Sequence, residues 1–462
     1  MLIEIVTMMN RKNNRRLKLI LLLLMACFGK GAAQDTTRLS LLFAGDVMGH
    51  DSQIAAAYNA GSGSYDYLTC FQFVKPYIAA ADLAIANLEV TLAGAPYKGY
   101  PAFSSPDALA LALQDAGFDA LVTANNHSCD KGKRGIERTI EMLDSFNIVH
   151  TGTFTDEASR LNDYPHIINK NGFKLALLNY TYGTNGIAVP KPTIVNLIDT
   201  AQMSKDIAKA KLSNPDYIIA FMHWGSEYQL QPNAFQKSIT KFLFDAGVQL
   251  VIGAHPHVLQ PMQFNKENQQ LVVYSLGNFV SGQRDRYKNG GAMVRIDLSK
   301  IRNDSAITRN IDSVNYILQY VHRDAQKKYV VLPVPTFENN TTGLIKDELS
   351  EQNFKTFIKD SRLLFDNYNT NITESRRLHF DSTSYSIKLF TLEKTNDNWV
   401  ILPPIDTFYG LHTNDTKDGK LDYYLGSFKR QIEAERVLEN LKKSMPRYDF
   451  SIAIFYNGKP AE

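Results

Sequence analysis

Five short polar segments each follow directly after a run of apolar residues, and this repeated pairing constrains the fold more than any other feature of the chain. The apolar runs cover residues 41–44, 83–86, 121–124, 218–222 and 248–252, and each predicts a buried β-strand. The polar segments after them are GDVM (45–48), NLE (87–89), NNH (125–127), HWG (223–225) and GAHPH (253–257). In open α/β sheets, ligands bind at the carboxyl ends of strands. Because Asp, Glu, Asn and His suit Zn, Mn, Fe or Mg, the pattern predicts a two-metal hydrolase site.

The order of predicted elements indicates an α/β domain. From residue 39 to about 298, strand-like and helix-like stretches alternate, as in layered α/β folds. Helices are predicted over residues 71–80, 106–116, 135–146, 201–212 and 234–246. Ser105 is a suitable N-cap for the second of these helices, which has Pro106 at its first position.

The chain divides into four predicted regions. Residues 1–33 are a leader, 34–300 the main domain, 301–415 an extension of unknown role, and 416–462 a small α+β unit. In the last region we expect a strand over 421–425, a helix over 431–444 and a strand over 450–456.

Residues 1–33 have the features of a secretory signal peptide. A basic region at 11–18 precedes an apolar run at 19–28, which is shorter than a membrane span. We therefore expect an exported protein of the periplasm or cell envelope, without a transmembrane span in the mature chain. Cleavage after Ala33 is the favoured processing route. The alternative is a lipid anchor at Cys27, because the tetrapeptide LMAC at 24–27 resembles a lipoprotein box.

Composition excludes several other classes of protein. The formal charge of +3 comes from the basic leader, and the remainder is nearly balanced, without a basic stripe that would indicate a nucleic-acid partner. Beyond the leader, only Cys70 and Cys129 remain, too few for a disulfide framework. They form either a single bridge or two buried thiols.

The polar segments supply each part of a phosphoesterase site. Phosphate esters hydrolyse between two metal ions ~3.5–4 Å apart, which need a bridging carboxylate and further N and O ligands. Either Glu89 or Asp46 is suited to bridge, and Asn126 offers a neutral oxygen. The imidazole ligands would be His223, His255 and His257. His127 would then stand beside the substrate and protonate the leaving group.

These motifs resemble the CapA family (poly-γ-glutamate capsule biosynthesis, also called PgsA) of the calcineurin-like metallophosphoesterase superfamily. They are GDVM at 45–48, ANLE at 86–89, ANNHSCDKG at 124–132, HWGSEY at 223–228, GAHPHV at 253–258 and YSLGNF at 274–279. The resemblance covers residues 41 to about 282. It implies an α/β fold, a calcineurin-like β-sandwich flanked by helices.

The resemblance also implies roles for individual residues. One divalent ion (Mn, Zn or Fe) would be held by Asp46 and His257, and a second by Asn126, His223 and His255, with Glu89 in the place of the superfamily's bridging aspartate. His127 would be the proton donor, and Asp130 would orient it. A plain Asp-Lys-Gly turn is the alternative for Asp130. We expect Asn278 to hold the loops by hydrogen bonds.

Met48 departs from the superfamily pattern, which has a histidine two residues after the first aspartate. A thioether is a poor ligand for these ions, so one ion would be weakly held or absent. His50 and Asp51 are candidates to complete its ligands.

The C-terminal unit resembles part of a SPOR domain, a module associated with peptidoglycan. The carrying residues are YYLGSF at 423–428 and AER at 434–436. The alternative is a generic strand–helix–strand end to the preceding region.

Two functions remain open at this point. The first is a metal-dependent hydrolase acting on a phosphoester in a surface polymer or its precursor. The second is a non-catalytic component that binds, exports or assembles an envelope polymer. The predicted partners are an anionic surface polymer or phosphorylated precursor, and peptidoglycan at the C-terminal unit.

Overall fold

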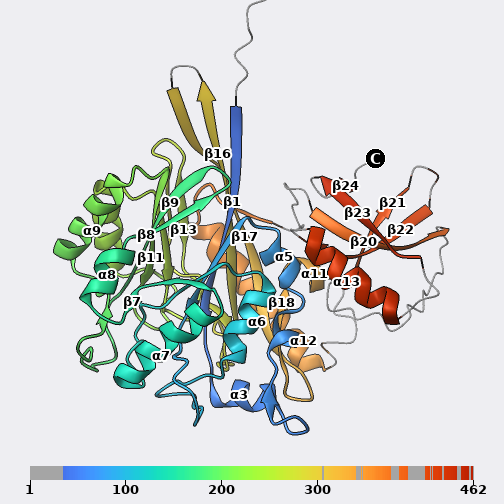
Figure 1. Cartoon of the computed structure of the whole chain (residues 1–462), viewed down its shortest axis with the longest axis horizontal. Helices are drawn as coiled ribbons and strands as arrows, with labels where there is room; N and C mark the ends of the chain where they lie inside the picture. Colours follow the sequence, from blue (N-terminus) through green and yellow to red (C-terminus); the bar gives the residue numbers. More distant parts are fainter. Residues whose placement is uncertain are drawn as a thin grey trace, which may run out of the picture.

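In the computed structural model, two β-sheets face each other and carry helices on their outer faces (Figure 1). The structure describes residues 35–303, 306–339, 345, 347–375, 384–393, 411–416, 418, 420–428, 431–444, 449–456 and 459–460. The α/β sandwich predicted from the sequence is confirmed.

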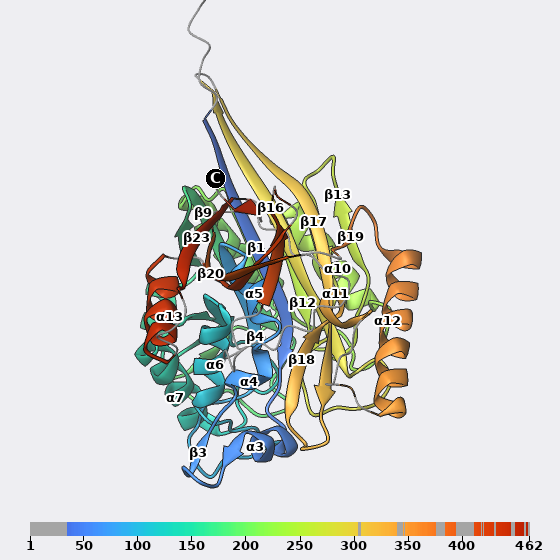
Figure 2. The same ribbon diagram turned by 90° about the vertical axis from the view of Figure 1, so that its right-hand side faces the viewer.

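The first sheet has nine strands among the described residues. Its main path is β18 (Tyr329–Pro333), β17 (Ala306–Arg323), β16 (Gly290–Asn303), β1 (Asp35–Val47), β4 (Leu83–Leu88), β5 (Ala120–Val122) and β6 (Val149–Thr151). Beside this path, β15 (Asn278–Val280) pairs with β1, and β19 (Thr373–Glu374) pairs with β17. Figure 2 shows β1 and the β16–β17 hairpin projecting beyond the sandwich where the described chain begins.

The second sheet has six strands. Their order is β13 (Met262–Asn265), β14 (Gln270–Val273), β12 (Leu250–Ala254), β11 (Tyr217–His223), β9 (Phe173–Thr181) and β8 (His166–Lys170). Short two-stranded pairs are formed by β2 (Tyr58–Asn59) with β3 (Ser64–Tyr65), and by β7 (Thr153–Phe154) with β10 (Ile194–Val195).

Alternating apolar side chains explain why the two sheets pack together. Along β1, Phe43 faces the core shared by both sheets, and its neighbour Leu42 faces the outer helices. Along β11, Phe221 lies in the shared core, and Met222 lies under the helices of the second sheet. The rings of Phe43 and Phe221 meet with centroids 6.3 Å apart. Strands that are apolar on both faces must be buried on both, which requires a layer of helices on each side.

The helices supply those two outer layers. Over the first sheet lie α4 (Leu68–Phe71), α5 (Lys75–Ala79), α6 (Ala108–Ala116) and α7 (Gly132–Ser145). Over the second lie α8 (Glu157–Asp163), α9 (Thr200–Leu212) and α10 (Ala234–Asp245), and α3 (Asp51–Ala57) follows β1.

Two predicted helices differ from those observed. The helix expected over 71–80 is split into α4 and α5, because the ring of Pro76 is incompatible with a continuous helix four residues earlier. The helix expected from Pro106 begins at Ala108, with Asp107 at the N-cap position and the buried Ser105 outside it.

The region predicted as an extension is divided between two bodies. Its first part, through β17, β18, α11 (Val334–Phe337) and α12 (Glu348–Tyr368), belongs to the sandwich. On α12, the rings of Phe354 and Phe357 lie 5.2 and 5.6 Å from that of Tyr320 on β17. Its second part, from residue 384, joins the C-terminal unit.

The C-terminal unit is a separate sheet with one helix. Its strands run in the order β21 (Leu411–Asp415), β22 (Lys420–Phe428), β20 (Ser384–Glu393), β23 (Ser451–Tyr456) and β24 (Lys459–Pro460), and α13 (Gln431–Ser444) packs on them. Ile387, Leu425 and Val437 lie in a core of its own. The predicted strand, helix and strand are present, and the SPOR-like role stays a prediction.

Residues 1–33, with the signal peptide and the lipid anchor at Cys27, lie outside the described residues. No helix in the described part of the chain is long and apolar enough to cross a bilayer. Cys70 and Cys129 are both free and buried, so of the two alternatives the chain has two buried thiols.

If α12 is part of the sandwich core, replacing Phe354 by Ala should destabilise the protein by about 3–5 kcal/mol, the usual cost of emptying a buried aromatic site. Phe354 is 1% exposed. The measurement is urea-induced unfolding followed by circular dichroism. Leu363→Ala on the same helix is the matched control, since Leu363 is 58% exposed. Equal stability of the two variants would contradict this placement of α12.

Candidate metal centre

The five predicted segments converge because their strands are parallel neighbours. In the first sheet, β1, β4 and β5 run parallel, and in the second, β11 and β12 do. Asp46 and His223 lie at the ends of β1 and β11, and Glu89 comes one residue after β4. The loops after β5 and β12 carry Asn126 with His127 and His255 with His257.

A bulge at Gly45 directs Asp46 toward the site. The pairing of β1 with β4 shifts register between Ala44 and Asp46, so Gly45 is the extra residue. A Cβ atom at Gly45 would lie 2.0 Å from the carbonyl oxygen of Gly277. Glycine is therefore required here, and it allows the Asp46 N–H to donate to that oxygen at 3.0 Å.

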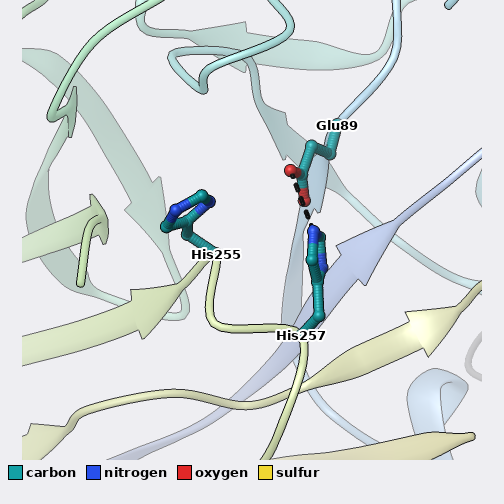
Figure 3. A group of neighbouring side chains, drawn as sticks. All are labelled: Glu89, His255 and His257. Atoms are coloured by element: carbon teal, nitrogen blue, oxygen red, sulfur yellow. Dashed lines mark ion pairs between the residues drawn. The ribbon is translucent and has the colours of Figure 1, made fainter. Parts of the chain in front are cut away.

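Glu89 lies at the centre of the cluster. Two groups have ligand atoms within 4.8 Å of one another, and both contain Glu89: one with His255 and His257, the other with Asp46 and His223. Figure 3 shows Glu89 and His257 pointing toward each other with His255 alongside. Glu89 Oε1 lies 3.7 Å from His257 Nε2 and 3.5 Å from His223 Nε2. Asp46 and His257, which the resemblance places on one ion, fall in different groups but are in direct contact, with His257 Nδ1 3.2 Å from Asp46 Oδ2.

The unpartnered atoms of this cluster fit a divalent cation. In the described part of the molecule, neither Glu89 oxygen nor His255 Nδ1 has a hydrogen-bond partner, although all three atoms are buried. Burying unpaired polar groups is costly, and such atoms call for a ligand. Carboxylate and imidazole donors suit Zn, Mn or Fe.

Burial and neighbouring charges set the protonation of the metal-free cluster. Burial raises the pKa of Glu89 well above its ordinary value, and the nearby Asp46 raises it further. Burial also tends to raise the pKa of Asp46, but the hydrogen bond and charge of His257 bring it below its ordinary value. The raised pKa of Glu89 favours its neutral form, whereas the lowered pKa of Asp46 favours its ionised form. A cation bound here would take the place of the Glu89 proton.

The imidazoles of His223 and His255 are held neutral, as metal ligands must be. Burial lowers the pKa of His223 well below its ordinary value, with a further contribution from His255. Burial likewise lowers the pKa of His255 to about 3, and the charge of His257 acts in the same direction.

Asn278 fixes the tautomer of His257. The amide nitrogen of Asn278 donates to the carbonyl oxygens of His257 and Lys288 and to Gln283 Oε1. Its oxygen therefore faces His257 Nδ1, 3.1 Å away, so Nδ1 carries the proton. His257 Nε2 is left with a lone pair directed toward Glu89. This is the hydrogen-bonding role expected for Asn278.

His223 is positioned by two asparagines. Asn87 Nδ2 donates to Asp46 Oδ1 at 2.8 Å and lies 3.2 Å from His223 Nδ1. On the other side, His223 Nε2 lies 2.8 Å from Asn126 Oδ1, whose amide group donates to Asn185. Asn126 thus presents its oxygen to the cluster, as a ligand role requires.

The loop carrying His255 and His257 is strained. His255 has φ of 97° and His257 has φ of 58°, and Pro256 stands between them. Positive φ is uncommon for residues other than glycine and tends to persist at functional sites. This backbone conformation directs both rings into the same cluster, with centroids 6.0 Å apart.

His127 and Asp130 form a hydrogen-bonded pair. His127 Nδ1 lies 2.8 Å from Asp130 Oδ2, which also accepts the N–H of Phe103 at 2.6 Å. The Phe103 ring meets the His127 ring edge-on at 4.6 Å. The Asp130 carboxylate therefore holds Nδ1 of His127 as a donor and leaves Nε2 for another partner.

Met48 and its neighbours do not add a ligand to the cluster. The Met48 side chain is buried in the apolar core under the first sheet. Asp51 pairs with Lys98 and accepts the Gly99 N–H. His50 uses Nδ1 toward Gln53 and the Gly282 N–H, and burial lowers its pKa.

Two residues near the cluster were not singled out by the sequence. Asn87 connects Asp46 to His223, although the sequence treated it only as part of a motif. Tyr182, 42% exposed, places its ring 4.6 Å from that of His255 and nearly parallel to that of His223. Tyr182 directly follows β9, so the rule that selects strand ends would have found it.

Two packed sheets between two helix layers, with a buried carboxylate–imidazole cluster at their strand ends, define an α/β sandwich with a candidate metal centre. The family model of the bacterial capsule synthesis protein PGA_cap matches residues 40–283, and this chain belongs to that family. The CapA-family membership predicted from the motifs is therefore confirmed.

Individual relatives agree with this assignment. The chain is 29% identical over 280 residues to the capsule biosynthesis protein CapA of Bacillus anthracis, which covers 57% of this chain and 65% of that protein. It is 27% identical over 337 residues to the PGA biosynthesis protein CapA of Bacillus subtilis, covering 71% and 82%. Among solved structures, the NAD nucleotidase NadN of Haemophilus influenzae matches with a TM-score of 0.36 and 15% identity over 71% of this chain and 61% of that one. A score this low supports no functional argument.

Replacing Glu89 by Gln should stabilise the metal-free protein at neutral pH. The folded state keeps a proton on Glu89 that the unfolded state loses above the ordinary pKa of 4.5, so stability falls as pH rises through that value. Glutamine removes this cost because its side chain does not ionise. We expect Tm to rise by about 2–4 °C per kcal/mol recovered, with a gain that grows from pH 5 toward neutrality.

The same variant should lose the stabilisation that Mn or Zn gives the wild type, which depends on affinity for the folded state. Differential scanning fluorimetry with and without metal measures both effects. Glu267→Gln, at an exposed position, should change neither. A destabilised metal-free Glu89→Gln protein would contradict the assignment of a neutral, buried Glu89.

Proposed function

We propose that this protein is a metal-dependent phosphoester hydrolase of the bacterial envelope that acts on a surface polymer or its phosphorylated precursor. The single observation that carries the proposal is Glu89, whose buried and unpartnered carboxyl lies between the imidazoles of His223 and His257. A protein that needed only to pack its core would not place an acid there, because its burial is costly.

The residues that would hold divalent ions are Asp46, Glu89, Asn126, His223, His255 and His257. When bound, such ions supply Lewis-acid polarisation of the phosphoryl group. The protein itself contributes a preformed set of donors. Asn278 orients His257 so that its Nε2 lone pair faces Glu89, and Asn87 orients His223, whose Nε2 faces the oxygen of Asn126.

His127 is the proposed general acid. Its Nδ1–H is held by Asp130, so Nε2 can carry the proton that the leaving oxygen requires. It lies close enough to the cluster for its charge to be felt by His223 and His255, whose pKa values are lowered first by burial. Asp130, held in turn by the Phe103 N–H, positions His127.

A non-catalytic role in polymer binding, export or assembly is the second candidate. The observation that favours it is the burial of Met48 in the core, which leaves one ion without a ligand from that position. Membership of the capsule-synthesis family supports a polymer as partner and is compatible with both candidates. Turnover that depends on His127 distinguishes the two.

Replacing His127 by Ala should lower kcat for a chromogenic phosphoester by about 10²–10⁴-fold in the presence of Mn or Zn, the usual contribution of a general acid. Metal content, measured by inductively coupled plasma mass spectrometry, should stay at the wild-type level. Asp130→Asn should also lower kcat, with KM unchanged, because it weakens the hydrogen bond that positions His127 and does not change the contacts of the substrate.

The chain offers a matched control in a second histidine–aspartate pair. His150 Nε2 lies 3.0 Å from Asp144 Oδ1 on the surface, away from the cluster. His150→Ala and Asp144→Asn should leave kcat unchanged. A wild-type protein without metal-dependent turnover of phosphomonoesters, phosphodiesters and cell-wall precursors would leave the non-catalytic role as the better proposal.

The C-terminal unit is proposed to dock on peptidoglycan. Support comes from its SPOR-like sequence and from its own apolar core, which makes it a unit apart from the sandwich. Its sheet begins with β20, so removal from residue 384 onward takes away the whole sheet. We expect the full chain to sediment with isolated peptidoglycan and the chain ending at residue 375 to remain in the supernatant.

Thermal unfolding of both proteins controls for damage to the sandwich, whose transition should be kept. Equal sedimentation of the two chains would assign peptidoglycan binding elsewhere and remove this role from the C-terminal unit.

A further inference from the structure

A pocket with a volume of about 400 Å³ opens at the end of the sandwich opposite the candidate metal centre. It is lined by the β8–β9 turn, the loop before β11 and the β16–β17 hairpin. From this pocket, β11 runs for seven residues to His223, a distance of roughly 20 Å at the rise of a β-strand. The pocket is therefore separate from the cluster around Glu89.

The lining of this pocket is strongly basic. Five cationic side chains surround it against the single carboxylate of Asp216; they are Lys170, Lys174, Lys300, Arg302 and Arg309. Three asparagines also line it and offer further hydrogen-bond donors. A concave site with one sign of charge concentrates ligands of the opposite sign.

Asp216 organises the cations at the base of the pocket. Its side chain is 7% exposed, and it accepts hydrogen bonds from Lys300 and Arg309, each at 2.7 Å, and from the Lys174 N–H at 2.8 Å. The Lys300 ammonium also lies over the Phe173 ring, 4.8 Å from its centroid. One carboxylate thus fixes two cations in place and leaves the site with an excess of positive charge.

Lys170 and Arg302 flank this base and are more exposed. The side chain of Lys170 is 37% exposed and lies 3.6 Å from Asp119, and Arg302 is exposed on β16. Neither contributes to the contacts of Asp216. The Arg302 guanidinium is therefore available to a ligand, the Lys170 ammonium has only its long contact with Asp119 to exchange, and replacing both leaves the base intact.

We propose that this pocket binds a segment of a linear polyanion, a polymer that carries carboxylate or phosphate groups along its chain. A volume of about 400 Å³ is in the range of ligand pockets and exceeds what one isolated anion needs. Cations on the four strands of two hairpins match a ligand with several charges. The inference does not depend on turnover at the metal centre.

The test measures binding of fluorescein-labelled polyglutamate by fluorescence anisotropy, at low salt and in the presence of EDTA. Unlabelled polyphosphate competes in a second arm and distinguishes phosphate from carboxylate as the preferred group. We expect Lys170→Gln/Arg302→Gln to weaken binding of the preferred polymer about 10-fold, which corresponds to two exposed ionic contacts. Binding should weaken as NaCl is raised, because such contacts are screened.

Lys237→Gln/Lys266→Gln removes the same charge at exposed positions on α10 and before β14, and it should leave binding unchanged. His127→Ala should also bind normally, so failure of the hydrolase proposal is distinguishable from failure of this one. Tm values verify that each variant is folded.

Three results would overturn the proposal. The first is that the wild type binds neither polymer at low salt, and the second is that the two double variants bind equally. The third is that the pocket variant loses binding only to vesicles of anionic phospholipid, which would make this face a membrane contact.

Discussion

The burial of Glu89 is the constraint on which the arrangement of the site depends. Its carboxyl group lies at the end of β4, in the middle of the first sheet, where no water-filled surface relieves its charge. Asp46 can remain ionised beside it only because Glu89 keeps a proton and because His257 offers Asp46 a hydrogen bond. Asn278 and Asn87 then fix His257 and His223 around the two acids. These contacts all surround the buried acid at position 89, and without that acid they would enclose no group that needs them.

Strand alternation made much of this arrangement predictable from the sequence. Strands that are apolar on both faces have to lie in the middle of a layered fold, and parallel strands bring their carboxyl ends to one edge. Asp46, Glu89 and His223 could therefore be placed together before any coordinates were known. The predicted roles of these residues as ligands remain to be measured.

Other features depend on contacts between distant residues, which local patterns do not encode. Met48 was expected to be a poor ligand, but the sequence did not indicate that its side chain packs in the apolar core. The register shift at Gly45 sets the direction of Asp46 and depends on a close approach to Gly277, more than two hundred residues away in the chain. Membership of β17 in the sandwich is likewise decided by pairing with β16, since polar residues along this hairpin resemble those of a surface loop.

The two ends of the sandwich carry sites of opposite charge preference. At the carboxyl ends of the strands, buried acids and neutral imidazoles form a closed cluster suited to cations. At the opposite end, exposed cations around Asp216 form an open pocket suited to anions. The length of β11 separates them by roughly 20 Å, which an extended polymer spans with about six or seven residues. A shorter anion occupies one end at a time, whereas a longer polymer held in the basic pocket has a raised effective concentration at the other. Polymer length, and not only the chemistry of one bond, would then determine which molecules are brought to the candidate metal centre.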